Sequence, residues 1–261
     1  MKALVVMLVA AATFELPPAL AELSDLSAAD AESLWAVDDE HGALFRLSAR
    51  DGAVLETVPF ADAGDFEAVA AVGDTVFAGR SDGALFAVDL KTRRARQLET
   101  ALPRDCELEG LAYERAGNRL LAACKRPSGT KAQRTWSIWA IDVATQKLSA
   151  SPVISIQREA IQAFRKEHPA KKLKDADDDL DPSGLAVHPK TGELYVVSAR
   201  ARVLLVLSRG GALIRLEALD ADRLPQPEAI AFLPDGTLFI GTEARRGKPA
   251  RIHLMEQAQP P

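Results

Sequence analysis

The stretch Glu107-Leu108-Glu109-Gly110-Leu111 decides the fold, because four other stretches of the chain repeat its pattern. Within each stretch, a small polar or acidic residue is followed by a small residue or Asp and then by an apolar run. The other four are Glu22-Leu23-Ser24-Asp25-Leu26, Asp65-Phe66-Glu67-Ala68-Val69, Asp181-Pro182-Ser183-Gly184-Leu185 and Pro227-Glu228-Ala229-Ile230-Ala231. A second apolar run follows each of them, as in Leu194-Tyr195-Val196-Val197. A repeat of roughly 40 to 45 residues made of short strands is typical of β-propeller blades.

The spacing of the repeats predicts five blades and one insertion. The leading residues follow one another at intervals of 43, 42, 74 and 45 residues; they are Ser24, Glu67, Glu109, Ser183 and Glu228. The long interval contains Arg158–Glu167, whose apolar residues have helical spacing and which ends before Pro169. We therefore expect an all-β, five-bladed propeller over residues 13–261, with one short helix in an insertion between blades three and four.

Blade five lacks a fourth strand at the carboxyl end of the chain. After Arg251–Met255 the sequence runs out into Gln257–Pro261. An open ring of blades would leave strand edges unpaired, so a strand from elsewhere should complete this blade. We expect Phe14–Pro18, at the other end of the chain, to supply it.

Length and composition favour one soluble domain. The chain has 261 residues, 48% of them hydrophobic, and a net charge of −5. Lys and Arg are scattered, and no basic stripe carries interleaved aromatic residues, so we expect no nucleic-acid partner. We expect a monomer whose partner is a small molecule or an envelope protein.

The first twelve residues resemble a secretory signal. Met1-Lys2 precedes an apolar run over Ala3–Ala12, which is far too short to span a bilayer as a helix. We expect residues 1–12 to be removed; the later site Ala19-Leu20-Ala21 would also remove the closing strand. The alternative is that residues 3–12 are themselves a strand. Cleavage would place the protein in the periplasm or outside the cell, with no integral membrane span.

The two cysteines, Cys106 and Cys124, flank a hairpin expected near Ala116-Gly117. Antiparallel pairing would bring them close, and in an oxidising compartment they could form a disulfide. The alternative is a pair of buried thiols. No zinc-ligand spacing is present.

The five motifs together resemble the SdiA-regulated family of bacterial β-propellers, which is distantly similar to NHL-repeat proteins. The resemblance covers roughly residues 14–256 and includes Phe14-Glu15-Leu16-Pro17, Leu108–Ala112 and Pro182–Ala186. It implies a five-bladed propeller, secretion or membrane tethering, and a bound calcium ion. Blade one departs from the family pattern, with Asp25 where the family usually has Gly.

The leading residues are the candidate metal ligands. The first strand of each propeller blade lines the channel, so Glu67, Glu109 and Glu228 should converge at one mouth. Converging carboxylates repel unless a positive charge lies among them or one of them is protonated. Calcium prefers oxygen ligands, and the hydroxyls of Ser24 and Ser183 could assist. Alternatively, the glutamates accept hydrogen bonds from backbone amides of neighbouring blades.

The acidic run that contains Asp175, Asp177 and Asp179 departs from a calcium loop, because Leu180 replaces the required glycine. We interpret this run as a solvated loop. Asp181, which lies two residues before Ser183, is its member expected to reach the channel and join the metal ligands.

Two functions remain open at this point. The first is a calcium-stabilised, non-catalytic binding or scaffold protein of the cell envelope, with its ligand site at the channel mouth beside the insertions 126–134 and 157–180. The second is a calcium-dependent hydrolase of the lactonase, esterase or phytase kind, by fold analogy only. The sequence contains no recognisable nucleophile motif. A hydrolase would need a general base near the ion, which the sequence does not identify.

Overall fold

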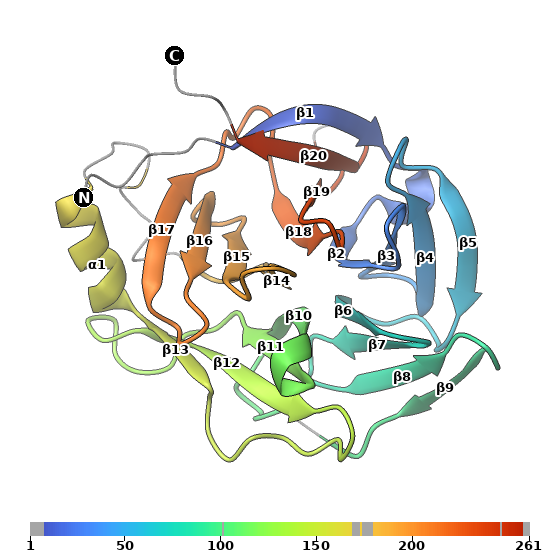
Figure 1. Cartoon of the computed structure of the whole chain (residues 1–261), viewed down its shortest axis with the longest axis horizontal. Helices are drawn as coiled ribbons and strands as arrows, with labels where there is room; N and C mark the ends of the chain where they lie inside the picture. Colours follow the sequence, from blue (N-terminus) through green and yellow to red (C-terminus); the bar gives the residue numbers. More distant parts are fainter. Residues whose placement is uncertain (1–7, 101, 169–172, 174–179, 246, 258–261) are drawn as a thin grey trace.

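The computed structural model describes residues 8–100, 102–168, 173, 180–245 and 247–257. In this part of the chain, five four-stranded antiparallel sheets surround a central axis as the blades of a propeller (Figure 1). The first strand of each blade packs against the first strands of the two neighbouring blades. The predicted five-bladed propeller is therefore confirmed.

Each blade is a meander of four strands, and the strands of blades one to three agree closely with the apolar runs of the sequence. They are β2 (Leu23–Ala28), β3 (Ser33–Asp38), β4 (Ala43–Ser48), β5 (Val54–Pro59), β6 (Phe66–Val72), β7 (Thr75–Arg80), β8 (Leu85–Asp89), β9 (Arg94–Gln97), β10 (Leu108–Glu114), β11 (Arg119–Cys124), β12 (Thr135–Asp142) and β13 (Ile154–Gln157). Blades four and five contain β14 (Gly184–Val187), β15 (Leu194–Ser198), β16 (Val203–Leu207), β17 (Leu213–Ala218), β18 (Pro227–Phe232), β19 (Leu238–Thr242), β20 (Arg251–Gln257) and β1 (Leu8–Glu15). Two short 3-10 helices occur at Pro18–Leu20 and Arg115–Gly117.

The apolar core is divided among the spaces between blades. Each of five buried clusters joins two neighbouring blades; Trp136 and Val196, for example, belong to the cluster between blades three and four. The packing is tight enough to require glycine at some positions. A methyl group on Gly79 in β7 would lie 2.4 Å from Leu108 Cδ2 in the next blade. Close packing of this kind fixes the relative positions of the strands that line the channel.

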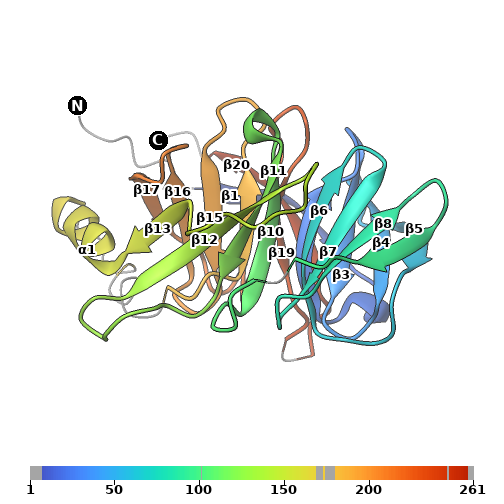
Figure 2. The same ribbon diagram turned by 90° about the horizontal axis from the view of Figure 1, so that it is seen from below.

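The helix of the insertion is where the sequence predicts it. Helix α1 (Arg158–Glu167) lies at the rim, beside β13 and β17 (Figures 1 and 2). Its only buried residue is Ile161, which packs into the cluster between blades three and four. Residues 174–179 of the acidic run that follows lie outside the described part of the chain.

The amino-terminal segment closes the ring, but earlier in the sequence than predicted. Strand β1 covers Leu8–Glu15 instead of Phe14–Pro18, and it pairs antiparallel with β20. Pro17 has no amide hydrogen to donate, and Pro18 begins a 3-10 helix, so the ladder ends before the two prolines. The last hydrogen bond before the prolines is donated by the amide of Leu16 to the Ala250 carbonyl at 2.8 Å.

This strand overlaps the segment expected to be a signal peptide. Residues 1–7 lie outside the described part, whereas Leu8–Ala12 belong to β1. Removal of residues 1–12 would shorten the closing strand to Thr13–Glu15. The signal peptide therefore stays a prediction, and it conflicts with full closure of blade five.

A buried histidine connects the closing strand to the rest of blade five. His253 in β20 is 2% exposed, and its Nδ1 and Nε2 lie 3.0 and 3.3 Å from the hydroxyls of Thr13 and Thr242. Burial, helped by the charge of Arg251, lowers the pKa of His253 from 6.5 to about 4. The histidine is therefore neutral in the folded protein at neutral pH.

Acidification should weaken this closure. The unfolded chain takes up a proton on His253 near pH 6.5 and the folded protein only near pH 4, so the contribution of His253 to stability is lost as the pH falls through that window. This contribution is about 3 kcal/mol in the free energy of unfolding. Buried carboxyl groups titrate in the same window, so urea denaturation at pH 6.5 and 4 measures it as the difference between the wild type and His253→Gln. The change from pH 6.5 to 4 should be more favourable by about this amount in His253→Gln and unaltered in His168→Gln, just after α1; the same change in all three proteins would contradict the assignment.

Candidate cation site at one mouth of the channel

The predicted leading residues hold equivalent places at the starts of the innermost strands. In blades one, two, three and five, the pairing between the first and second strands skips one residue of the first strand, which marks a β-bulge. The skipped residues are Ser24, Glu67, Glu109 and Glu228. In blade four the amide of Ser183 donates to the Val197 carbonyl, although Gly184 is the registered partner of Val197. A bulge redirects the side chain of the extra residue away from the regular alternation. The repeat in the sequence is thus a repeat of this local geometry.

The glutamates of blades two and three lie close enough to repel one another. Glu109 is 4% exposed, and burial is the main cause that raises its pKa from 4.5 to about 7, with the charges of Glu228 and Glu107 adding to it. Burial raises the pKa of Glu67 from 4.5 to about 9, helped by the charge of Glu109 and by the neighbouring Asp65 carboxyl. Glu67 is therefore protonated at neutral pH.

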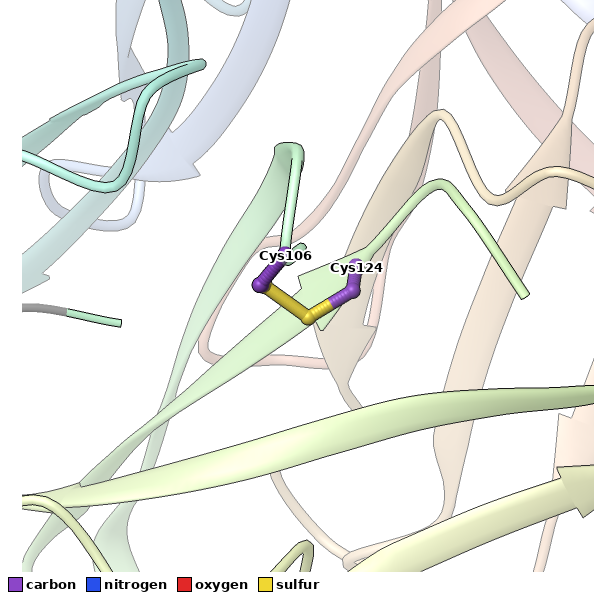
Figure 3. Close-up of a disulfide and its surroundings, with 2 residues drawn as sticks. All are labelled: Cys106 and Cys124. Carbon is purple, nitrogen blue, oxygen red and sulfur yellow. A yellow bond between two sulfur atoms is a disulfide. The ribbon is translucent and has the colours of Figure 1, made fainter. Parts of the chain in front are cut away.

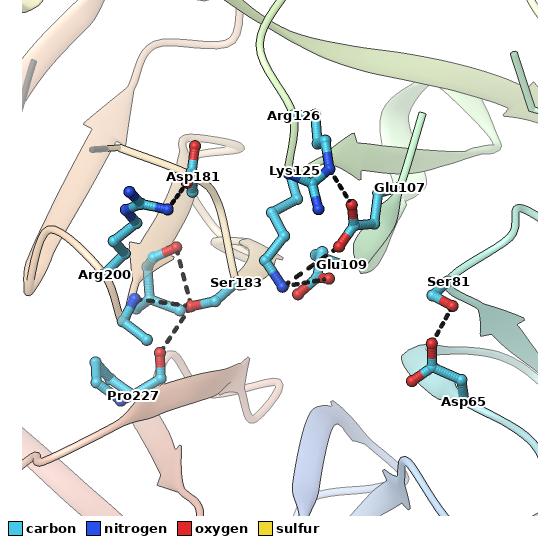
Figure 4. Close-up of polar contacts among 12 residues, drawn as sticks. Asp65, Ser81, Glu107, Glu109, Lys125, Arg126, Asp181, Ser183, Arg200 and Pro227 are labelled. Carbon is cyan, nitrogen blue, oxygen red and sulfur yellow. Dashed lines mark hydrogen bonds and ion pairs between the residues drawn. The ribbon is translucent and has the colours of Figure 1, made fainter. Parts of the chain in front are cut away.

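A lysine that the sequence did not reveal lies among these carboxylates. Lys125, the residue after β11, places its Nζ 2.8 Å from Glu109 Oε1 and 3.6 Å from Glu107 Oε1 (Figure 4). Burial is the largest single effect and opposes its charge, but the hydrogen bond to Glu109 and the charges of Glu109 and Glu107 together outweigh burial and raise the pKa of Lys125 above its usual value. The repulsion expected from the sequence is thus relieved in both anticipated ways, by a positive charge and by a proton on Glu67.

The other half of the mouth carries carboxylates that were not predicted. Burial, helped by the charges of Glu228, Glu22 and Asp39, raises the pKa of Glu243 from 4.5 to about 8. Burial and the charge of Glu22 raise the pKa of Asp39 from 3.8 to about 6. Both residues follow the ends of second strands, β19 and β3, which lie outside the repeated motif. A comparison of second-strand ends across blades could have identified them.

The two serines of the predicted set are held by backbone groups. Ser24 Oγ donates to the Glu22 carbonyl at 3.0 Å. Ser183 Oγ donates to the Pro227 carbonyl at 2.8 Å and accepts from the Ala199 amide at 3.1 Å (Figure 4). The Ser183 hydroxyl also lowers the pKa of Glu228, against the larger effect of burial. Ser183 therefore lies beside the acidic cluster.

Asp181 is engaged elsewhere. Its carboxylate lies 3.2 Å from Arg200 Nη1 (Figure 4) and accepts a hydrogen bond from Trp136 Nε1 at 3.4 Å. An arginine already balances its charge. The structure does not bring Asp181 together with the three glutamates.

The donor chemistry at this mouth suits a hard cation, but the arrangement is not a finished metal site. In the described part of the chain, no three His, Cys, Asp or Glu side chains are grouped so that they could hold a metal ion as they stand. One buried oxygen, Asp39 Oδ1, has no hydrogen-bond partner among the described residues. Calcium would require the carboxylates to draw together and Lys125 to leave Glu109.

Cross-blade hydrogen bonds, considered above for the glutamates, are made instead by Asp25. This fully buried carboxylate accepts from the amides of Leu26 and Val69 at 2.8 Å each and from that of Leu111 at 3.4 Å. Three blades thus share one side chain. Burial raises the pKa of Asp25 well above its usual value, although the three amides act in the opposite direction.

A disulfide fixes the strands that carry the ion pair. Cys106 and Cys124 are bonded, with their Cα atoms 4.9 Å apart (Figure 3). Cys106 directly precedes Glu107, and Cys124 directly precedes Lys125. The bond therefore ties the segment that bears Glu107 and Glu109 to the one that bears Lys125.

We call the channel end that carries Glu67, Glu109, Glu228 and Glu243 the acidic mouth. A surface cavity adjoins the disulfide at the rim of this mouth. Its volume is about 500 Å³, and its lining includes Cys106, Glu107 and Arg126–Ser128. The last three residues open the insertion 126–134 that was expected to border the ligand site. The cavity is within the size range of small-molecule sites.

Fold and site together define a five-bladed β-propeller with an acidic channel mouth whose charge is partly offset by Lys125 and by a proton on Glu67. Residues 9–246 match the sequence model of the SdiA-regulated family. The chain belongs to that family. No curated protein matches it closely enough to count as a relative. None of the helices in the described part of the chain is long and apolar enough to cross a membrane.

Solved structures that resemble this fold are distant in sequence. Glutaminyl cyclase of Myxococcus xanthus is 13% identical, with a TM-score of 0.66 and 97% of each chain covered. The PQQ-bound aldose sugar dehydrogenase of Streptomyces coelicolor is 13% identical, with a TM-score of 0.58 and coverage of 97% of this chain and 98% of the other. The WD40 repeats of RRP9 are 9% identical, with a TM-score of 0.54 and coverage of 96% and 100%. At such identities the likeness concerns the fold alone.

Proposed function

We propose that this propeller is a secreted or periplasmic binding or scaffold protein that holds a calcium ion at its acidic mouth. The proposed ligands are the carboxylates of Glu67, Glu109 and Glu228, with the hydroxyls of Ser24 and Ser183 nearby. When bound, the ion would supply the positive charge that the buried carboxylates lack. Asp181 is left out of this set because Arg200 balances its charge.

One observation carries the proposal. Three glutamates from three blades all have raised pKa values, caused first by burial, and one half-buried lysine is the only cation that forms an ion pair with any of them among the described residues. Such a cluster favours any cation that can replace protons and Lys125. Oxygen-only donors favour calcium over softer metals.

The proposed compartment rests on two features. The amino terminus resembles a secretory signal, and the bonded pair Cys106–Cys124 suits an oxidising environment. Mass spectrometry of protein recovered from the periplasm tests this: we expect a first residue at Thr13. An intact chain confined to the cytoplasm would reject the proposed location.

Calcium should stabilise the protein. Binding to the folded state alone, at one hundred times the dissociation constant, adds about 2.7 kcal/mol, which raises the melting temperature by about 5 to 10 °C. Thermal melting in calcium and in EDTA measures the difference. Glu109→Gln should abolish the response to calcium. An unchanged melting temperature in the wild type at millimolar calcium would reject the metal.

Lys125 should compete with the ion, since both neutralise Glu109. Lys125→Gln is therefore expected to tighten calcium binding about ten-fold by removing this tethered charge. The matched control is Lys91→Gln, because Lys91 forms an exposed ion pair with Asp74 far from the channel. Calorimetric titration compares the variants; weaker binding in Lys125→Gln would show that the lysine supports the site.

A hydrolase is the second candidate, and one observation favours it. Asp39 lies beside the cluster with a pKa of about 6 and an unpaired buried oxygen, which suits a general base near neutral pH. Turnover of lactones, aryl esters or phytate that EDTA abolishes, and that Asp39→Asn abolishes without loss of calcium binding, would establish this activity. If none of these substrates is turned over, the hydrolase is rejected and only the binding function remains.

A further inference from the structure

The opposite mouth of the channel holds a cavity with a different chemistry. The acidic residues lie at the amino-terminal ends of the innermost strands, whereas this cavity, of about 410 Å³, is lined by their carboxyl-terminal ends. Strands of this length separate the two ends by roughly 13 to 20 Å. Between the two mouths, Asp25 hydrogen-bonds to amides of neighbouring strands and the first strands pack closely together. A methyl group on Gly184, for instance, would lie 2.5 Å from the Glu228 carbonyl oxygen.

The deep part of the cavity is apolar. Four aliphatic side chains at equivalent places in their strands line it: Leu26, Leu111, Leu185 and Ile230. In its own strand, each directly follows the residue that is equivalent to Asp25. Phe232 adds an aromatic ring, which makes edge-to-face contact with His188 at a centroid distance of 4.8 Å. The volume and lining suit one small ligand with an apolar body.

The rim of the cavity is positive. Arg115 and Arg209, from blades three and four, both line it and are exposed. No carboxylate in the described part of the chain forms an ion pair with either guanidinium, whereas Glu114, the acidic residue of the lining, is bound by Arg119 at 2.5 and 3.1 Å. Arg209 is partly fixed, because its Nε donates to the Thr191 carbonyl at 2.6 Å. Its remaining donors are thus available to an anion.

His188 adds an oriented donor beside Phe232. Its Nδ1 accepts from the amides of Lys190 and Thr191 at 3.2 and 3.1 Å, so Nε2 carries the hydrogen of the neutral ring. Burial lowers the pKa of His188, which favours that neutral form. No described residue accepts a hydrogen bond from Nε2.

We propose that this cavity, the basic mouth, binds a small carboxylic acid with an aromatic or aliphatic body. The apolar part would contact Leu111, Leu185 and Ile230, and the carboxylate would face Arg115 and Arg209. Charge complementarity selects an anion over a neutral or cationic molecule of the same shape. This site does not depend on the acidic mouth or on calcium.

The test compares two probes of the same shape, 2-naphthoate and 2-naphthamide. In 0.1 M salt we expect the carboxylate to bind about five-fold more tightly, the effect of partly exposed ion pairs. The double variant R115Q/R209Q should lower the ratio to about one, while R94Q, at an exposed position in β9, should leave it unchanged. Because all three arginines are exposed, we expect the variants to keep the melting temperature of the wild type. This measurement checks that they fold.

Amide chemical shifts locate the probe. Binding should move the signals of Ala112, Val187 and Phe232 and spare those of Glu67 and Glu109. The inference is overturned by the absence of saturable binding at 1 mM probe, by equal affinity for the two probes, by an equal loss of preference in R94Q, or by shifts confined to the acidic mouth.

Discussion

Raising the pH from 6.5 to 9 should lower the free energy of unfolding of the calcium-free protein by on the order of 5 kcal/mol. The pKa values of Glu67, Glu243 and Glu109 are raised from 4.5 to about 9, 8 and 7. The folded protein therefore holds protons that the unfolded chain has already released. A carboxyl group with a raised pKa contributes its stability at low pH and loses it as the pH rises through the folded value. Urea denaturation in EDTA across this range measures the loss.

The comparison with Glu67→Gln isolates the cause. Glutamine keeps the size of the side chain and cannot ionise, so the variant should lose less stability between pH 6.5 and 9 than the wild type. Calcium should also reduce the loss in the wild type, because the ion replaces the missing protons. Stability that stays constant or increases over this range would contradict the crowding of charge at the acidic mouth. His253 interferes little, since only about 0.4 kcal/mol of its effect remains above pH 6.5, and in the opposite direction.

Replacing Asp25 by alanine should destabilise the protein by about 4 kcal/mol, because buried amides of three blades lose their acceptor. The amides are those of Leu26, Val69 and Leu111, and the first strands cannot shift to satisfy them without disturbing the core. Denaturation by urea at pH 7 measures the change.

Two variants control for this effect. Asp25→Asn keeps an acceptor oxygen and should cost less than alanine, whereas Asp62→Ala, at an exposed position, should change stability by under about 0.5 kcal/mol. A cost for Asp25→Ala as small as that of Asp62→Ala would show that the three blades do not depend on this carboxylate.

The blades were predictable because their signals are local and repeated. The start and end of β2, β3, β15 and β16 follow directly from apolar runs bounded by turns. The interval between Glu109 and Ser183 likewise revealed the insertion, and its helix begins and ends at the predicted residues. The closing strand was displaced because residues 1–12 were assigned to a signal peptide, which left Phe14–Pro18 to close the ring, whereas the ladder depends on amides that Pro17 and Pro18 lack.

The site was predictable only where the repeat carries it. Glu67, Glu109 and Glu228 share a bulge, so one pattern identified all three. Lys125 follows a second strand, and only the hairpin that ends in Cys124 brings it back to Glu109. The basic mouth was missed for the same reason: Arg115 and Arg209 lie in turns of different length, with no common place in the repeat.

We propose that a cation lies among Glu67, Glu109 and Glu228 at the acidic mouth of the channel. Crystals grown in calcium and measured at a wavelength that enhances its anomalous signal test this directly. We expect one anomalous peak near the propeller axis, about 2.3 to 2.6 Å from oxygens of these glutamates, with Lys125 displaced from Glu109. Absence of a peak there, with Lys125 Nζ still bound to Glu109, would contradict the claim.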